Sequence, residues 1–155
     1  MTAGGGNQSL DRPAEEPIDP AIYGAFIGQI ELASIWLSSS SVENPGAPDI
    51  PWEASIDIAA NAHWESAEDG FVAFHAYDVK IEVTESKIAG ISVTFGLGFK
   101  SEQAISEELF TVFQDVNLPV NTWPYLRSYV ADSLGRMGWP TLTLPAFKAG
   151  IQSPT

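Results

Sequence analysis

Regular alternation of apolar and polar residues marks much of this chain. In residues 52–64 every second residue, from Trp52 to Trp64, is apolar, and most of the residues between them are polar. A period of two over so long a run predicts a β-strand with one buried face. The alternation returns in residues 71–83 and 91–99, and residues 66–70 (SAEDG) have the composition of a turn. We therefore predict three consecutive strands.

A further strand is predicted ahead of these three, over residues 25–42. Its apolar positions change parity near Ala33, because Leu32 is even-numbered whereas Ile35 and Leu37 are odd-numbered. A slip of one residue would move the apolar side chains to the other face of a sheet. We therefore predict a β-bulge at this point.

After residue 100 the apolar period becomes helical. Residues 101–115 are predicted as one helix, beginning at Ser101, with apolar residues at helical spacing. The sequence NLPVN then interrupts the pattern. A second helix is predicted over residues 122–137, with Thr122 as its N-cap and Pro124 in its first turn.

The second predicted helix has an unusually wide apolar stripe, which suggests burial on two sides. Leu126, Val130 and Leu134 form the stripe, and Tyr125 and Tyr129 lie beside it. A four-stranded sheet also has more apolar surface than one long helix covers, and the chain contains five Trp and eight Phe. Surplus apolar surface of this kind indicates contact with other copies of the chain and a place for an apolar partner.

Together these elements predict one α+β domain, a four-stranded antiparallel sheet with helices packed on one side. We place the domain at residues 21–147. Residues 1–20, rich in Gly, Pro and acids, are predicted to be a disordered N-terminal arm, and residues 148–155 a flexible tail.

Composition narrows the classes of partner. The net charge is −13, which disfavours nucleic acid and anionic membrane surfaces. The chain has no Cys, which excludes disulfides and zinc–thiolate sites. It has neither a secretory signal at its N-terminus nor a run of about 18 apolar residues that could insert into a membrane. The cytoplasm is the expected location.

The acidic residues are unevenly distributed. Residues 13–79 contain no Lys or Arg, whereas Asp and Glu recur along them. This region could be a well-solvated surface, an electrostatic docking site for a basic partner, or a charged guard against self-aggregation. The sequence leaves these three readings open.

No catalytic or metal-binding pattern stands out. His63 and His75, the only histidines, lack the spacing of metal ligands, and we expect structural or solvent-facing roles for them. Adjacent acids such as Glu107 and Glu108 fit a solvated surface better than an acid–base pair in a cleft. The serine run at residues 38–41 lacks a nucleophile motif. We predict no catalytic residue, no metal and no cofactor.

Residues 124–147 (PYLRSYVADSLGRMGWPTLTLPAF) resemble the SecB family of export chaperones. The matching positions are Pro124, Tyr125, Arg127, Arg136, Trp139, Pro140, Leu142, Leu144, Pro145 and Phe147. Weaker agreement extends upstream, at Ile27 and Ile30, at Trp52, and at Val93, Gly96 and Phe99.

The resemblance implies a dimer of dimers whose long helices pack at the tetramer interface. It also implies binding of unfolded polypeptide clients in apolar grooves without ATP, followed by transfer to the SecA motor. The groove residues we expect on this basis are Trp52, Phe95, Phe99, Phe113, Trp139 and Phe147. The interface residues we expect are Tyr125, Leu126, Tyr129, Val130 and Leu134.

Two departures from the family change the expectation. The family usually has another helix after the Pro-x-x-Phe segment, whereas this chain stops at Thr155, so the groove is expected to be more open. The strand glutamate with which the family contacts SecA aligns with Ser92. The 124–147 segment looks closer to SecB-like chaperones of toxin–antitoxin systems.

The function predicted from the sequence is therefore a holding chaperone for protein export or for an aggregation-prone client. The alternative is a module dedicated to one protein, such as an antitoxin. A small-ligand enzyme or carrier is a third, weaker reading.

Overall fold

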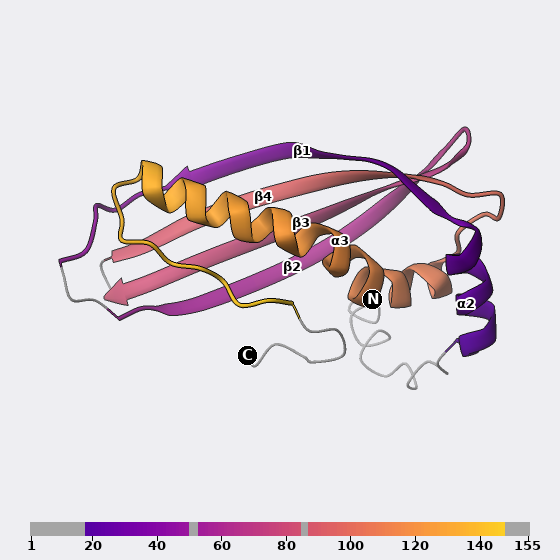
Figure 1. Ribbon diagram of the computed structural model, residues 1–155, viewed down its shortest axis with the longest axis horizontal. Helices are drawn as coiled ribbons and strands as arrows, with labels where there is room; N and C mark the ends of the chain where they lie inside the picture. Colours follow the sequence, from indigo (N-terminus) through magenta and orange to yellow (C-terminus); the bar gives the residue numbers. More distant parts are fainter. Residues whose placement is uncertain (1–17, 50–52, 85–86, 148–155) are drawn as a thin grey trace, which may run out of the picture.

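The computed structural model describes residues 18–49, 53–84 and 87–147. The elements follow the order α2 (Pro20–Gln29), β1 (Glu31–Glu43), β2 (Ser55–Ala67), β3 (Gly70–Thr84), β4 (Lys87–Lys100) and α3 (Glu107–Arg136). The four strands form one antiparallel sheet in the order β1-β4-β3-β2, and α3 lies across one of its faces (Figure 1). The predicted α+β fold is confirmed.

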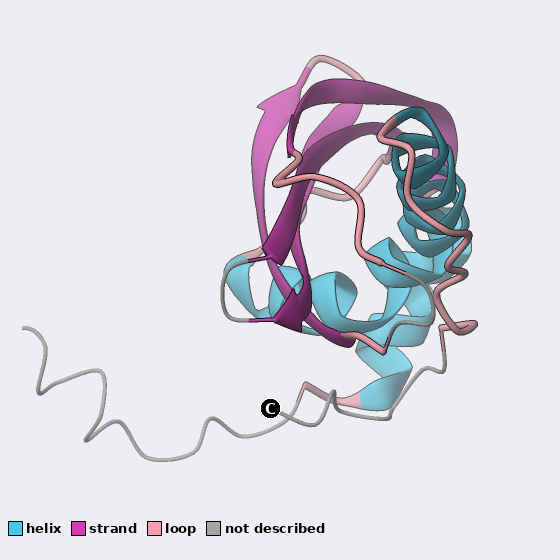
Figure 2. Cartoon of the chain, turned by 90° about the vertical axis from the view of Figure 1, so that its left-hand side faces the viewer, coloured by secondary structure: helices cyan, strands magenta, loops and turns pink. Residues whose placement is uncertain are grey.

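The period of two along the strands decides which face of the sheet is covered. In β3, Tyr77 and Val79 are buried beneath α3, whereas Asp78 and Lys80 are exposed on the opposite side. We call these the inner and outer faces. Figure 2, an end view of the molecule, shows α3 on one side of the curved sheet. The turn between β2 and β3 lies at residues 68–69, inside the predicted turn.

Strand β1 pairs with β4, so the connection from β1 to β2 passes from one edge of the sheet to the other. Its register passes from the pair Leu32–Phe99 to the pair Ser34–Gly98, which leaves Ala33 without a partner. This irregularity is the predicted bulge. A second one, at Ser38, was not visible in the apolar pattern.

The prediction of a strand for the whole of residues 25–42 is wrong at its start, where α2 occupies Pro20–Gln29. Asp19 Oδ1 accepts the Ala21 N–H at 2.9 Å, and Pro20 occupies the first helical position. The segment is apolar on almost every side, so its pattern fits a helix and a strand equally well. The predicted arm and tail lie outside the described residues apart from residues 18–20, and they stay predictions.

The two helices predicted after residue 100 are a single helix, α3, which begins at the N-cap Ser106 rather than at Ser101. Pro119 and Pro124 lie inside it, and each costs about 3 kcal/mol or more in a helix interior. Burial of a large apolar side chain stabilises by about 1.5–3 kcal/mol. The helix buries Leu109, Phe110, Phe113, Leu118, Leu126, Val130 and Leu134. The free energy gained by burying these side chains together exceeds the free-energy cost of the two prolines.

An aromatic cluster fixes both helices to one end of the sheet. Phe26 of α2, Phe71 of β3, Phe99 of β4 and Phe113 of α3 have ring centroids 5.0–6.3 Å apart. All four are almost completely buried. Neither α2 nor α3 has the combination of length and apolar character that a membrane-spanning helix requires.

Candidate peptide-binding surface

Beyond α3 the chain turns back along the helix as an extended segment, residues 138–147, which we call the strap (Figure 1). Gly138 permits the turn with a φ of +81°. Trp139 is buried, and its Nε1 donates to Asn44 Oδ1 at 2.9 Å. Asn44 Nδ2 in turn donates to the Met137 carbonyl at 3.1 Å. The start of the strap is therefore fastened to the connection between β1 and β2.

The far end of the strap is held by two side chains of α3. Arg127 Nε donates to the Leu144 carbonyl at 2.8 Å, and Trp123 Nε1 donates to the Pro145 carbonyl at 2.6 Å. We call Trp123 and Arg127 the clamp. The Trp123 ring lies between Tyr77 of β3, at 6.0 Å, and Phe147, at 5.9 Å. Clamp and strap thus meet the inner face on one flank of α3.

The opposite flank of α3 faces β1 across a furrow of about 370 Å³. Its lining is mixed, with apolar or aromatic side chains at Val42, Tyr129 and Met137 and polar or charged ones at Asp132, Ser133 and Arg136. Tyr125, on the same flank, is 51% exposed and its ring lies 6.2 Å from that of Phe95. Leu37 of β1 is 48% exposed. Leu37 and Tyr125 therefore expose apolar surface to solvent on this flank, and a partner could pack against it.

The predicted groove residues occupy several environments. Phe95, Phe99, Phe113 and Trp139 are each 5% exposed or less and pack in the subunit core. Phe147 is half-buried at the end of the strap. Trp52 lies outside the described residues. The structure therefore does not gather these side chains into one open groove.

The predicted interface residues divide in the same way. Leu126, Val130 and Leu134 are fully buried against the subunit's own sheet. Tyr125 and Tyr129 lie on the β1 flank, where Tyr129 is half-buried. Of these five predicted interface residues, the two tyrosines are therefore the ones with surface available to a second subunit.

The outer face carries a row of aromatic side chains that sequence reasoning missed. Trp36 of β1 lies over Gly96 of β4 and meets Phe74 edge-on at 6.4 Å, and Phe74 stacks on His63 of β2 at 5.0 Å. A Cβ atom at Gly96 would lie 2.4 Å from the Trp36 ring. A Trp in one strand opposite a Gly in the next was the signal available in the sequence. It can be recognised only when the register between β1 and β4 is known.

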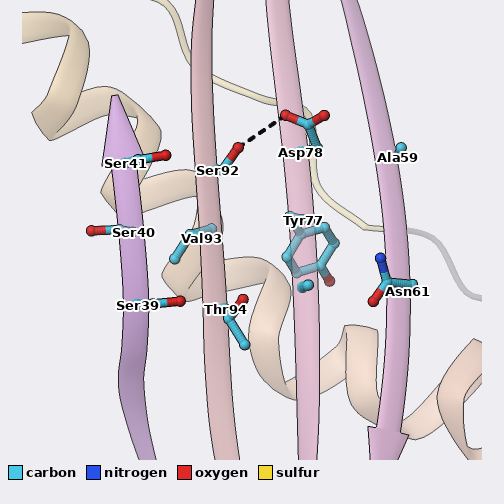
Figure 3. Close-up of a pocket in the computed structure, with 11 residues that line it drawn as sticks. Ser39, Ser40, Ser41, Ala59, Asn61, Tyr77, Asp78, Ser92, Val93 and Thr94 are labelled. Carbon is cyan, nitrogen blue, oxygen red and sulfur yellow. Dashed lines mark hydrogen bonds between the residues drawn. The ribbon is translucent and has the colours of Figure 1, made fainter. Parts of the chain in front are cut away.

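Beside this aromatic row lies a shallow polar trough of about 520 Å³ (Figure 3). Short side chains from all four strands line it, including Ser39, Ser41, Asn61 and Thr94. Ser92, at the position aligned with the family's SecA-contacting glutamate, donates a hydrogen bond to Asp78 Oδ1 at 3.1 Å.

A polar cluster is buried between the sheet and the middle of α3. Thr122 Oγ1 donates to the Leu118 carbonyl at 2.9 Å and lies 2.9 Å from His75 Nδ1 and 2.7 Å from the Tyr77 hydroxyl. A hydroxyl has one proton to donate, so Thr122 accepts from both neighbours and His75 Nδ1 carries a proton. Burial lowers the pKa of His75 to about 4. Burial raises the pKa of Tyr77 to about 12, against the opposing effect of its hydrogen bond to Thr122.

The two histidines occupy different environments. His75 is part of the packed interior, and His63 is an exposed residue of the outer face. Among the described residues, no group of three or more His, Asp or Glu side chains is placed to hold a metal ion.

Comparison with solved structures finds similar folds. The chain superposes on a Mycobacterium tuberculosis SecB-like chaperone, solved in complex with a ChAD peptide from the HigA1 antitoxin, with a TM-score of 0.73. The match has 20% sequence identity and covers 82% of this chain and 97% of the other. The fold is SecB-like.

A protein of unknown function from Streptococcus agalactiae also matches, with a TM-score of 0.40 and 8% identity over 76% of this chain and 98% of the other. No protein-family model matches the sequence. A search of curated proteins found no match either. The likeness to the SecB-like chaperone, at 20% identity, establishes the fold that the resemblance implied.

Proposed function

We propose that this chain is an ATP-independent holding chaperone that binds non-native polypeptide segments through apolar contacts. The observation that carries the proposal is the SecB-like fold, shared along 97% of a chaperone that was solved with an antitoxin peptide. The chain also exposes large apolar side chains at Ile22, Leu37, Val120 and Tyr125, which are available for contact with a client.

The acidic surface fits this activity as a guard against self-aggregation. A net charge of −13 makes copies of the chain repel one another while their apolar side chains stay accessible. Of the three readings that the charge distribution left open, we therefore propose the guard against self-aggregation.

We propose that the functional form is a dimer of dimers. The exposed β1 flank of α3, with Tyr125 and Tyr129, supplies apolar surface for packing against a second subunit. Burial of such surface on association is the main favourable term in most oligomers.

The second candidate is a module dedicated to one client. It is favoured by the complex of the matched chaperone, whose bound peptide comes from a single antitoxin. The two functions differ in breadth. A general chaperone suppresses aggregation of unrelated unfolded proteins, whereas a dedicated one protects a single partner.

The experiment is an aggregation assay with two chemically unrelated unfolded proteins, together with titration of a ChAD peptide from the HigA1 antitoxin. Suppression of both aggregation reactions at stoichiometric chaperone supports the general function. Binding of the peptide alone supports the dedicated function. Absence of both activities contradicts the proposal.

Trp52→Ala provides a variant for the same assays. Trp52 remains our first proposed client contact, and loss of an interface aromatic weakens binding by about 1–3 kcal/mol. Loss of a core aromatic instead costs about 3–5 kcal/mol of stability. Intact client affinity with a large loss of unfolding free energy would remove Trp52 from the proposed groove.

Salt dependence separates apolar capture from charge-driven docking. Added salt screens exposed charges but leaves apolar contacts in place. We expect client affinity to survive from low to physiological ionic strength. Binding that disappears over this range would identify the acidic surface as the site and the protein as a receptor for basic segments.

A further inference from the structure

The strap is bound to the rest of the molecule in the way that an extended peptide ligand is bound. Among the described residues, the last backbone–backbone hydrogen bond of this region is that from Trp139 N to the Leu134 carbonyl. From residue 140 to residue 147, no backbone pairing to another element of the described chain is present. Within the described chain, residues 140–147 of the strap are therefore held through side-chain contacts.

Both hydrogen bonds of the clamp end on main-chain carbonyls of the strap. Trp123 and Arg127 lie four residues apart, and therefore on one flank of α3, and they take the carbonyls of consecutive strap residues. A carbonyl is present in every residue, so donors placed in this way recognise an extended backbone whatever its sequence. Selectivity must then come from the apolar side chains beside them.

The apolar side chains of the strap are spaced as anchors. Leu144 is 1% exposed, Leu142 and Phe147 are half-buried, and Thr141, Thr143, Pro145 and Ala146 are exposed. Over residues 141–145 this alternation is that of an extended chain with one face in a groove, and Phe147 follows three residues after Leu144. Pro145 lacks a backbone N–H, so β-sheet pairing could not replace the clamp there.

We propose that residues 141–147 are the resting occupant of the client groove and that an incoming extended segment displaces them. The partner that fits is an extended polypeptide with apolar side chains at the spacing of Leu142, Leu144 and Phe147. Its carbonyls take over the hydrogen bonds of Trp123 and Arg127. This inference rests on the proposed chaperone function and assigns its site and its regulation.

The anchoring of the strap allows such a movement. Trp139 is buried and fastened to Asn44, so the start of the strap can stay in place while the residues after it leave. A client that fills the same pockets restores the contacts that the strap gives up. Only molecules whose groove is free can bind the client, so the apparent affinity is the intrinsic affinity multiplied by the fraction of such molecules. Weakening the strap raises this fraction and therefore the apparent affinity.

The test uses Leu144→Ala, with Thr143→Ala as the matched control on the exposed side of the strap. The probe is reduced, carboxymethylated lactalbumin, which is permanently unfolded. If the strap competes with the client, Leu144→Ala should bind the probe more tightly than wild type, by about 3- to 10-fold. Thr143→Ala should bind it like wild type. If the strap is a fixed wall of the groove, Leu144→Ala should instead bind more weakly, and the proposal is overturned.

Phe147→Ala repeats the test at the end of the strap, where truncation removes a half-buried side chain and threatens the fold less. Far-ultraviolet circular dichroism of each variant verifies that the chain is folded. A tighter complex with both folded variants supports displacement. Unchanged or weaker binding by either folded variant overturns it.

Thiol labelling gives a second readout that does not depend on affinity. The chain has no Cys, so Leu144→Cys introduces a single thiol at a buried position. Displacement of the strap predicts that its reaction with a thiol reagent accelerates as the probe is added and saturates with the probe's own affinity. A labelling rate unchanged at saturating probe overturns the proposal.

The outcomes also separate this inference from the proposed function. A wild-type chain that binds the probe while the strap variants bind it no more tightly leaves the chaperone function standing and removes the competing strap. Failure of wild type and all strap variants to bind the probe or the ChAD peptide removes the chaperone function itself.

Discussion

At the scale of single residues, the buried cluster of His75, Tyr77 and Thr122 shows how a polar group is accommodated in an apolar core. Thr122 uses its one donor and both acceptor positions, so no hydrogen-bonding capacity of its hydroxyl is wasted. Buried polar groups that lack partners typically cost about 1–3 kcal/mol each. The cluster therefore fixes the position of α3 on β3 without a large penalty.

Acid should weaken the fold through His75. Its pKa in the folded chain is lowered to about 4, because burial disfavours the charged ring. The pKa in the unfolded chain is about 6.5. The unfolded state therefore binds more protons between these values, and stability that is present above pH 6.5 is lost as pH falls towards 4. The loss from this residue is about 3 kcal/mol in order of magnitude.

The measurement compares urea denaturation at pH 7 and pH 4.5 for wild type and His75→Gln. The substitution should remove this part of the loss. His63→Gln is the matched control, because His63 is exposed on the outer face. An identical pH dependence for wild type and His75→Gln would contradict the argument.

The contact between Trp36 and Gly96 gives another prediction at this scale. A Cβ at Gly96 would meet the indole at 2.4 Å, so Gly96→Ala must push Trp36 from the outer face. Overpacking of this kind costs about 1–3 kcal/mol. Gly24→Ala, in α2 with no atom within 4 Å of the added Cβ, should be neutral or stabilising. Denaturation of both variants tests the pair, and equal stabilities would refute the close contact.

At the scale of elements, the strands were predictable because a half-buried strand records its buried face in every second residue. The bulge at Ala33 was predictable for the same reason. The continuity of α3 was not, because Pro119 and Pro124 are local signals for interruption and the packing that overrides them is long-range. Thr122 was accordingly predicted as a helix cap, although its hydroxyl serves residues more than forty positions earlier.

The prolines of α3 should still carry their local cost. Pro124 is exposed, so Pro124→Ala restores a backbone N–H to the Val120 carbonyl without loss of buried surface. We expect the free energy of unfolding to rise by about 1–3 kcal/mol. Pro119→Ala should gain less, because Pro119 is buried and its truncation leaves a space. Thermal and urea unfolding of the two variants measure the difference; a destabilised Pro124→Ala would show that the ring itself is needed.

At the scale of the whole molecule, the family resemblance of residues 124–147 predicted the fold correctly. These residues form the end of α3 and the strap, and both pack in defined positions against the sheet. The candidate site could not be located in the same way. Trp139 and Phe99 are aromatic in the motif and in the strand pattern, but nothing in a sequence distinguishes a core aromatic from a groove aromatic. The clamp was equally hidden, because Arg127 and Leu144 meet only in the folded chain.

The assembly proposed above makes the last prediction, which concerns the β1 flank of α3. Tyr125 is 51% exposed in the single subunit, so Tyr125→Glu should leave the subunit's unfolding free energy nearly unchanged. In an interface the same carboxylate would be desolvated without a partner, at several kcal/mol in order of magnitude. Tyr129→Glu should act similarly, with a larger effect on the subunit because Tyr129 is half-buried.

Sedimentation equilibrium at micromolar concentration measures both variants against Ser66→Glu, which adds the same charge to an exposed position near the β2–β3 turn. Wild type and Ser66→Glu should sediment as tetramers, and the tyrosine variants as smaller species that remain folded. A monomeric wild type would contradict the assembly itself. Tetrameric tyrosine variants would instead place the interface elsewhere, because a buried, unpaired carboxylate and an unchanged association constant are incompatible.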